Sequence, residues 1–157
     1  MPYLIDGNNL MGQIFPQTFR EKQSKYSLIY DLLVFQRRKR TRVFVVFDGA
    51  AEPGLEKFQK KEFSIIYPPL GQKADGIIKE IISRETDLRR FFVVSSDREI
   101  KRFARSKGAK ALSSKEFSRE LKTALKQNMR FQEFQKEVSK LTPLEIDHWL
   151  TIFKNRK

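Results

Sequence analysis

Short apolar runs alternate along this chain with longer segments of helical character, and this alternation limits the folds available to it. Residues 43–47 read Val-Phe-Val-Val-Phe and residues 91–94 read Phe-Phe-Val-Val, without a polar break. Continuous runs rich in β-branched and aromatic residues favour parallel strands that are covered on both faces. We expect strands over residues 2–6, 42–48, 62–67 and 91–96, and a weaker fifth strand over residues 109–112.

Between these runs, apolar residues recur at the spacing of helices. The pattern predicts helices over residues 20–40, 73–84, 97–107 and 114 to about 139, and a short one that opens at Thr142-Pro143. In the first of them, the apolar stripe is expected to comprise Tyr26, Ile29, Tyr30, Leu33 and Val34. Strands that alternate with helices predict βαβ units, which build a mostly parallel sheet with helices on both faces.

The length of 157 residues suits one domain of ordinary size. We predict an α/β body over residues 1–112 and a helical C-terminal extension over residues 113–157. The formal net charge is +13, and residues 101–157 hold 15 basic but 6 acidic side chains. Such an excess favours a polyanionic partner, above all nucleic acid, although a solubilising surface would give the same composition.

The composition also excludes several kinds of site. The sequence has no cysteine and one histidine, His148, which excludes disulfides, thiolate zinc sites and zinc clusters built from histidines. No apolar run reaches the roughly 18 residues that a membrane span requires, so no membrane partner is expected. The N-terminus lacks the basic segment and apolar stretch of a signal peptide, and a cytoplasmic location is the expectation.

Four aspartates fall at related places in the predicted elements. Asp6, Asp48 and Asp97 each end or follow a predicted strand, and Asp75 opens the helix after the third strand. Because the carboxyl ends of parallel strands meet at one edge of a sheet, we expect all four there. Close carboxylates repel one another, and Mg²⁺ or Mn²⁺ relieves that repulsion by taking oxygen ligands. The pattern therefore predicts a metal site that acts on phosphate esters.

Each of these acids also has a purely structural interpretation. Asp6-Gly7 and Asp48-Gly49 are common turn pairs, and Asp97 is a suitable helix cap. Asp75 would be a first-turn acid that the helix dipole stabilises. No single position is specific, so the hypothesis depends on four acids at one edge of a strongly basic chain.

The order of these motifs resembles a known family. Asp6-Gly7-Asn8-Asn9, Phe47-Asp48-Gly49, Lys73-Ala74-Asp75 and Ser95-Ser96-Asp97 occur in the order found in the NYN family of PIN-like nucleases, and most resemble its YacP-like branch. The resemblance extends from about residue 2 to residue 112, and the tail with Leu144 and Trp149 is also similar.

The resemblance implies a three-layer PIN-like fold and metal-dependent endoribonuclease activity. By position, Asp6, Asp75 and Asp97 look like the metal-binding carboxylates, with Ser95 or Ser96 as support. Asn9 and Asp48 also match residues at the active edge of the family. Two positions depart from the pattern, because Gly76 stands where many relatives carry a second Asp and Lys101 stands where some carry an acid. One Mg²⁺ or Mn²⁺, completed by substrate phosphate, is therefore expected rather than two.

The expected partner is RNA, with mRNA and the ribosome as the candidates. Candidate RNA-binding residues are Lys73, Arg98 and Lys101 near the acids, and Arg38 and Arg40 in the basic run over residues 37–42. That run also suits a helix end, where cations complement the dipole. Phe15 is either a stacking platform for a base or a core residue.

Two other functions remain open at this point. A non-catalytic RNA- or ribosome-binding protein with a degenerate acidic site would explain the charge and the missing acids. A phosphatase-like or nucleotide-binding domain is disfavoured, because the chain lacks the glycine-rich phosphate loops of such domains.

Overall fold

The computed structural model describes residues 1–138, and within them a five-stranded parallel sheet has the order β3-β2-β1-β4-β5. The strands are Tyr3–Asp6 (β1), Val43–Val46 (β2), Phe63–Ile66 (β3), Phe92–Val94 (β4) and Lys110–Leu112 (β5). All five predicted strands are therefore confirmed. Ile5 of β1 is in register with Val45 of β2 and Val94 of β4, so the three central strands end together at one edge.

The helices are Gly7–Ile14 (α1), Lys22–Lys39 (α2), Ala74–Arg84 (α3), Arg98–Ser106 (α4) and Ser114–Val138 (α5), with a short 3-10 turn at Glu56–Phe58. The four long helices confirm the predictions. The helix α1 was not expected, because two glycines and two asparagines in its eight residues disfavour a helix. It forms because Leu10 and Met11 are buried in the core, and this gain outweighs the low propensity.

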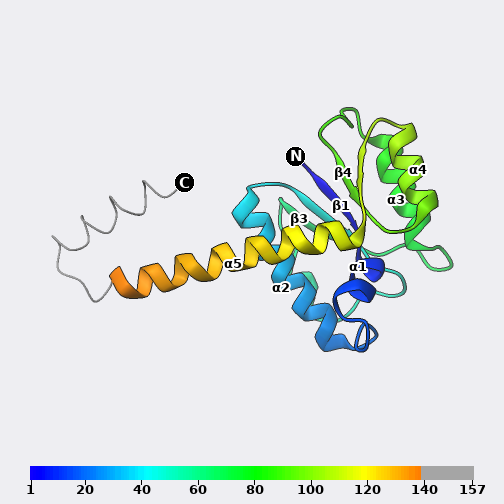
Figure 1. The fold of residues 1–157 in the computed structure, drawn as a ribbon. Coiled ribbons are helices and arrows are strands. Elements are labelled where there is room, and N and C mark those ends of the chain that lie inside the picture. The colour runs from blue at the N-terminus through cyan, green and yellow to red at the C-terminus, as the bar shows by residue number, and fades with distance from the viewer. Residues whose placement is uncertain (139–157) are drawn as a thin grey trace.

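Successive residues of β1 face opposite helical layers, as the pleat of a strand requires. Ile5 belongs to a buried cluster that includes Leu28 of α2 and Phe117 of α5. Leu4 belongs to the cluster on the other face, with Ile78 of α3 and Ile100 of α4. The helices α3 and α4 thus cover one face of the sheet while α1, α2 and α5 cover the other, which confirms the three-layer α/β arrangement (Figure 1).

The buried stripe of α2 differs from the expected one. Leu28, Leu32 and Phe35 are fully buried, whereas Tyr30 is 55% exposed. Tyr30 packs edge-on against Phe58, with 5.2 Å between the ring centroids. The expected stripe was wrong at this position because Tyr30 and Leu33 lie on the flank of the helix, and the i, i+4, i+7 row that starts at Leu28 faces the sheet.

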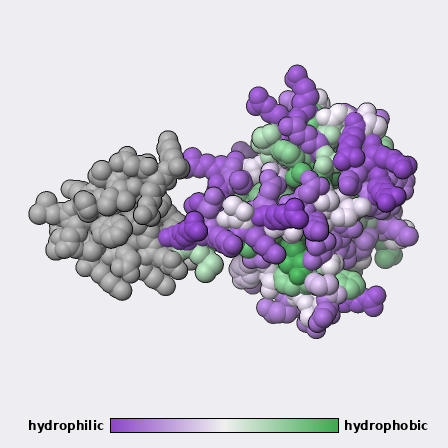
Figure 2. Space-filling model, in the orientation of Figure 1, coloured by the Kyte–Doolittle hydropathy of each residue, from purple (hydrophilic) through white to green (hydrophobic). Residues whose placement is uncertain are grey.

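The helix α5 crosses the body and continues beyond it (Figure 1). Phe117, Leu121 and Ala124 are buried against the body, while several basic residues of the helix are exposed, among them Lys115, Arg119, Lys122 and Lys126. On the face that Figure 2 shows, hydrophilic residues cover most of the described surface.

The predicted terminal helix, His148 and Trp149 lie outside the described residues. In the part of the chain that the structure describes, no helix has the length and apolar character to cross a membrane.

Candidate functional site

Asp6 is the last residue of β1 and lies at the carboxyl edge of the sheet. The hydroxyl of Ser95 donates a hydrogen bond to its Oδ2 at 2.9 Å. Burial raises the pKa of Asp6 from 3.8 to about 6, the Ser95 bond partly opposes this shift, and the charges of Asp48 and Asp97 add to it. A partly buried carboxylate with two acids nearby is the arrangement that a bound cation would stabilise.

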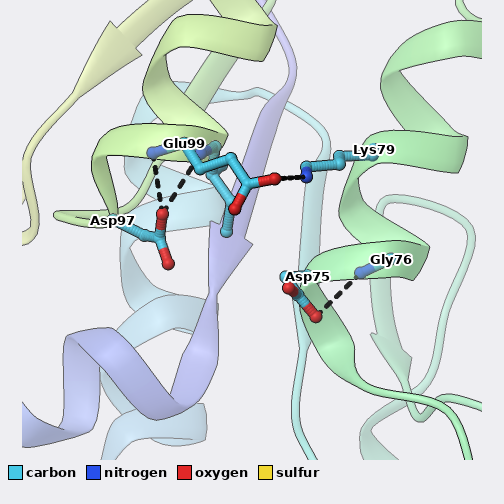
Figure 3. A network of polar contacts seen from close by, with 6 residues as sticks. Asp75, Gly76, Lys79, Asp97 and Glu99 are labelled. Carbon is cyan, nitrogen blue, oxygen red and sulfur yellow. Dashed lines mark hydrogen bonds and ion pairs between the residues drawn. The ribbon is translucent and has the colours of Figure 1, made fainter.

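Asp97 follows β4 and begins α4. Its Oδ1 accepts hydrogen bonds from the backbone N–H groups of Glu99 (2.8 Å) and Ile100 (3.3 Å), so the predicted helix cap is confirmed. Its own N–H donates to the Ser95 hydroxyl at 3.1 Å, which connects Asp97 to Asp6 through one side chain. The second carboxylate oxygen of Asp97 points away from α4 (Figure 3). The capping role therefore leaves one oxygen for a ligand.

Asp48 holds the loop after β2 against the start of α3. Its Oδ1 accepts a hydrogen bond from the N–H of Ala74 at 2.8 Å. Its own N–H donates to Asn8 Oδ1, also at 2.8 Å. These two bonds fix the first turn of α3, which carries Asp75, relative to α1. Asp48 thus positions the neighbouring acid as well as adding negative charge to the edge.

Asp75 lies in the first turn of α3, and its Oδ1 accepts a hydrogen bond from the N–H of Gly76 at 3.0 Å. One turn further on, the ammonium group of Lys79 pairs with Glu99 Oε1 at 2.6 Å and joins α3 to α4. The pKa of Lys79 is raised, first by its hydrogen bond to Glu99, with smaller contributions from Asp75 and Asp97. Figure 3 shows this ion pair beside the two aspartates.

Lys79 and Glu99 were not recognised from the sequence. The available signal was their spacing, since Lys79 is four residues after Asp75 and Glu99 is two after Asp97. Residues four apart share a helix face, so Lys79 had to lie near Asp75. The contact with Glu99 depends on how α3 packs against α4, which no local pattern encodes.

Whether the acids at this edge can hold a metal ion depends on how closely their side chains are grouped. Among residues 1–130, whose side chains the structure describes, no three histidine or acidic side chains are grouped so that they could hold one metal ion together. Asp6, Asp75 and Asp97 therefore lie at one edge without forming a ready-made three-carboxylate centre. Mg²⁺ commonly binds one or two carboxylates and completes its shell with water and substrate phosphate. Asp6 and Asp97, connected through Ser95, fit that smaller set of ligands.

Asn9 connects three elements beneath the same edge. Its Oδ1 accepts hydrogen bonds from the N–H of Ser96 at 2.9 Å and from the hydroxyl of Ser114 at 2.5 Å. The N–H of Ser114 donates in turn to the Ser96 hydroxyl at 3.1 Å. Asn9 of α1 thus positions the loop after β4 and the first residue of α5. Its contacts are those of a positioning residue.

The candidate RNA-binding residues divide into two groups. Lys73 and Arg98 are exposed at the starts of α3 and α4, beside the acids, and Lys101 is partly buried on α4. Arg38 and Arg40 are exposed at the end of α2, next to the start of β2. That position is at the opposite edge of the sheet, so the structure separates this pair from the acids. Phe15 packs against the core.

Comparison with known proteins supports the resemblance that the motifs suggest. The family model described as "YacP-like NYN domain" matches residues 3–151. The structure of Rae1 (YacP) from Bacillus subtilis has a TM-score of 0.70 and 24% identity, and the match covers 98% of this chain and 92% of that one. Its W164L mutant gives 0.68 and 20%, with 94% and 89% covered. These likenesses show a shared fold. No curated protein matched the sequence.

Proposed function

Since the chain belongs to the YacP-like NYN family, whose domains are nuclease-like and related to RNA, we propose that it is a metal-dependent endoribonuclease. It would hydrolyse phosphodiester bonds in RNA at the carboxyl edge of the sheet. The observation that carries the proposal is Asp6, a partly buried acid at the end of β1 with a raised pKa, beside Asp48 and Asp97. An acid with a perturbed pKa beside further acids at such an edge is typical of catalytic sites.

In this reaction, different residues of the protein would bind the metal and orient its ligands. Asp6 and Asp97 would hold Mg²⁺ or Mn²⁺. Asp75, at the start of α3, would be the third acid at this metal site. When bound, such a cation supplies an activated water and stabilises negative charge on the phosphoryl oxygens. Ser95 keeps the Asp6 carboxylate oriented through its hydrogen bond.

The basic residues around the acids would bind the RNA. Lys73 and Arg98 are exposed at the two helix starts that border the acids, where they can contact phosphates on either side of the scissile bond. Phosphate contacts of this kind position the strand without selecting a sequence.

The decisive experiment is a cleavage assay on structured and unstructured RNA with the purified protein. Cleavage should require Mg²⁺ or Mn²⁺, stop with a chelator, and be lost in Asp97→Asn. Asparagine still accepts the capping bonds of α4, so the fold and most RNA binding should survive this change. The matched control is Asp87→Asn, because Asp87 is an exposed acid in the loop before β4, at the other edge. Full activity of purified Asp97→Asn protein would contradict the mechanism.

A second candidate function is a non-catalytic RNA-binding protein. The observation in its favour is that no three acidic or histidine side chains of the described chain form one metal-binding group. Gly76 and Lys101, where relatives carry acids, point the same way. In the same assay, this alternative predicts RNA binding without cleavage at any metal concentration, equal in the wild type and in Asp97→Asn.

We also propose mRNA on the ribosome as the natural substrate. The support is the exposed basic face of α5, with Lys115, Arg119 and Lys122 among its members, which extends away from the body (Figure 1). Cosedimentation of the full chain with ribosomes should be seen at low salt and be weakened when Arg119 and Lys122 are both replaced by glutamine. Equal cosedimentation of that variant and the wild type would contradict the role of this face.

A further inference from the structure

A pocket of about 270 Å³ lies beside the acidic edge, between α1, the start of α2 and the loop after β2. Its lining includes Asn8, Phe19, Arg20, Lys22, Lys25 and Glu52. Asn8 also accepts the hydrogen bond from the N–H of Asp48, so one residue belongs both to the pocket and to the edge. A chain bound across the acids would therefore pass next to this pocket.

Lys25 is the most buried cation of this lining. Its side chain is 13% exposed, and its Nζ lies 4.8 Å from the centre of the Phe47 ring and 5.5 Å from that of Tyr67. Burial lowers its pKa, and Glu52 opposes the shift. The Glu52 carboxylate is 3.9 Å from Nζ, which is too long for a hydrogen bond. The ammonium group thus keeps hydrogen-bond donors that this ion pair does not use.

The mouth of the pocket combines an aromatic ring with exposed cations. Phe19 is 37% exposed, and the guanidinium carbon of Arg20 lies 5.4 Å from its ring centre. Lys22 is exposed next to them. Two acids, Glu21 and Glu52, also line the pocket, so it offers acceptors as well as donors. A simple anion would be repelled by those acids, whereas a nucleobase presents both donors and acceptors.

These features match the way proteins recognise single-stranded RNA. Unpaired bases stack on aromatic rings or on arginine planes, and polar groups read their edges. We infer that this pocket binds one nucleotide of single-stranded RNA next to the phosphodiester at the acidic edge. Its base would stack on Phe19 and Arg20, and an acceptor of the same nucleotide would face Lys25. The inference rests on the proposed function in one respect, since it takes RNA as the substrate.

The experiment measures binding apart from cleavage. Fluorescence anisotropy of labelled hexanucleotides of A, C or U is recorded with the full chain in a chelator, so that the RNA stays intact. Phe19→Ala should weaken binding about fivefold or more, the loss expected from one stacked base. Lys25→Met should weaken it by a similar factor, because a charged hydrogen-bond donor is lost. They should also reduce the preference among the three sequences.

Two control variants match these changes outside the pocket. Tyr30→Ala removes an exposed aromatic residue from α2, and Lys110→Met removes a positive charge at the start of β5. Both should bind within about twofold of the wild type, because surface changes outside a site have small effects. Phe19 is exposed, so unchanged circular dichroism of Phe19→Ala would show that its loss of binding is not a loss of fold.

The outcomes separate the two proposals. If the pocket variants bind RNA as tightly as the controls, the proposal that the pocket binds a nucleotide is overturned, whether or not the wild type cleaves RNA. Weaker binding in both pocket variants, in a protein that cleaves no RNA with any metal, would support the pocket and contradict the endoribonuclease.

Discussion

Gly7, which directly follows Asp6, lies where the surrounding atoms leave no room for a side chain. A Cβ atom at this position would lie 2.6 Å from Phe47 Cε1 and 2.9 Å from the carbonyl oxygen of Val46. Phe47 is packed in the core and Val46 belongs to a strand of the sheet, so neither can shift to make room for the added atom. Gly7→Ala should lower the free energy of unfolding by about 1–3 kcal/mol, as overpacking typically does. Chemical denaturation measures this change.

Gly12→Ala in the same helix is the matched control. A Cβ at Gly12 meets nothing within 4 Å among the described residues. Alanine is the better helix former by about 1 kcal/mol, so this variant should be as stable as the wild type or more so. Similar destabilisation by both substitutions would contradict the proposed crowding at Gly7.

Asp6 should make the stability of the metal-free protein depend on pH. Burial raises its pKa from 3.8 to about 6, so the folded protein holds this proton more tightly than the unfolded chain. The stability that Asp6 contributes is then complete below about pH 4 and is lost as the pH rises through about 6. The wild type should therefore lose stability relative to Asp6→Asn over this interval, and the difference should be constant above about pH 7.

Urea unfolding of both proteins at a series of pH values measures that difference. The comparison cancels the titration of acids that lie far from position 6, because they are common to both chains and do not interact with Asp6. Parallel stability profiles for the wild type and Asp6→Asn would contradict the raised pKa.

At the scale of single residues, the sequence predicted where acids would gather but not how each is bound. Asp97 was recognised as a helix cap because capping is a local pattern. The contact between Ser95 and Asp6 joins positions 89 residues apart, and a motif shows no such bond. For the same reason, the ion pair of Lys79 with Glu99 emerged from the structure alone.

At the scale of elements, the strands were predictable because each is a continuous apolar run between polar segments. The helix α1 was missed because its propensity is low and its burial comes from tertiary contacts of Leu10 and Met11. The face of α2 was misjudged at Tyr30, since a helix with apolar residues on two sides does not reveal which side meets the sheet.

Asn9 should contribute to stability by joining three elements. In Asn9→Ala, the N–H of Ser96 and the hydroxyl of Ser114 lose their shared acceptor. Ser114 is buried, and an unsatisfied buried donor costs about 1–3 kcal/mol, so the unfolding free energy should fall by that order. Hydrogen exchange at the Ser96 and Ser114 amides should accelerate, because the loop after β4 and the start of α5 lose their common contact.

The control for this prediction is Gln127→Ala, which removes an exposed amide from α5. This change should leave both unfolding and exchange near the wild-type values. If Asn9→Ala matched Gln127→Ala in stability and exchange, the three elements would not depend on Asn9.

For the whole molecule, the positions of the basic residues predict which edge of the sheet contacts RNA. Binding of single strands weakens with salt, with a slope of about 0.7 per phosphate contact on a double-logarithmic plot. Lys73→Met and Arg98→Met should each reduce that slope by about 0.7. Arg38→Met and Arg40→Met should leave it unchanged, because both residues lie at the opposite edge. Equal changes of the slope in both pairs of variants would contradict RNA binding at the carboxyl edge of the sheet.

The attachment of α5 has a mechanical consequence. Its first residue, Ser114, is bonded to Asn9 and Ser96 directly beneath the acids, and its 25 residues extend for about 37 Å at the rise of an α-helix. An α-helix is stiff over this length, and the hydrogen bonds of Ser114 restrict the rotation of α5 about its first turn. A partner bound to the outer turns of α5 would lie at a fixed distance from the acids. If the proposed cleavage takes place there, the position of the cut would depend on that distance rather than on the RNA sequence.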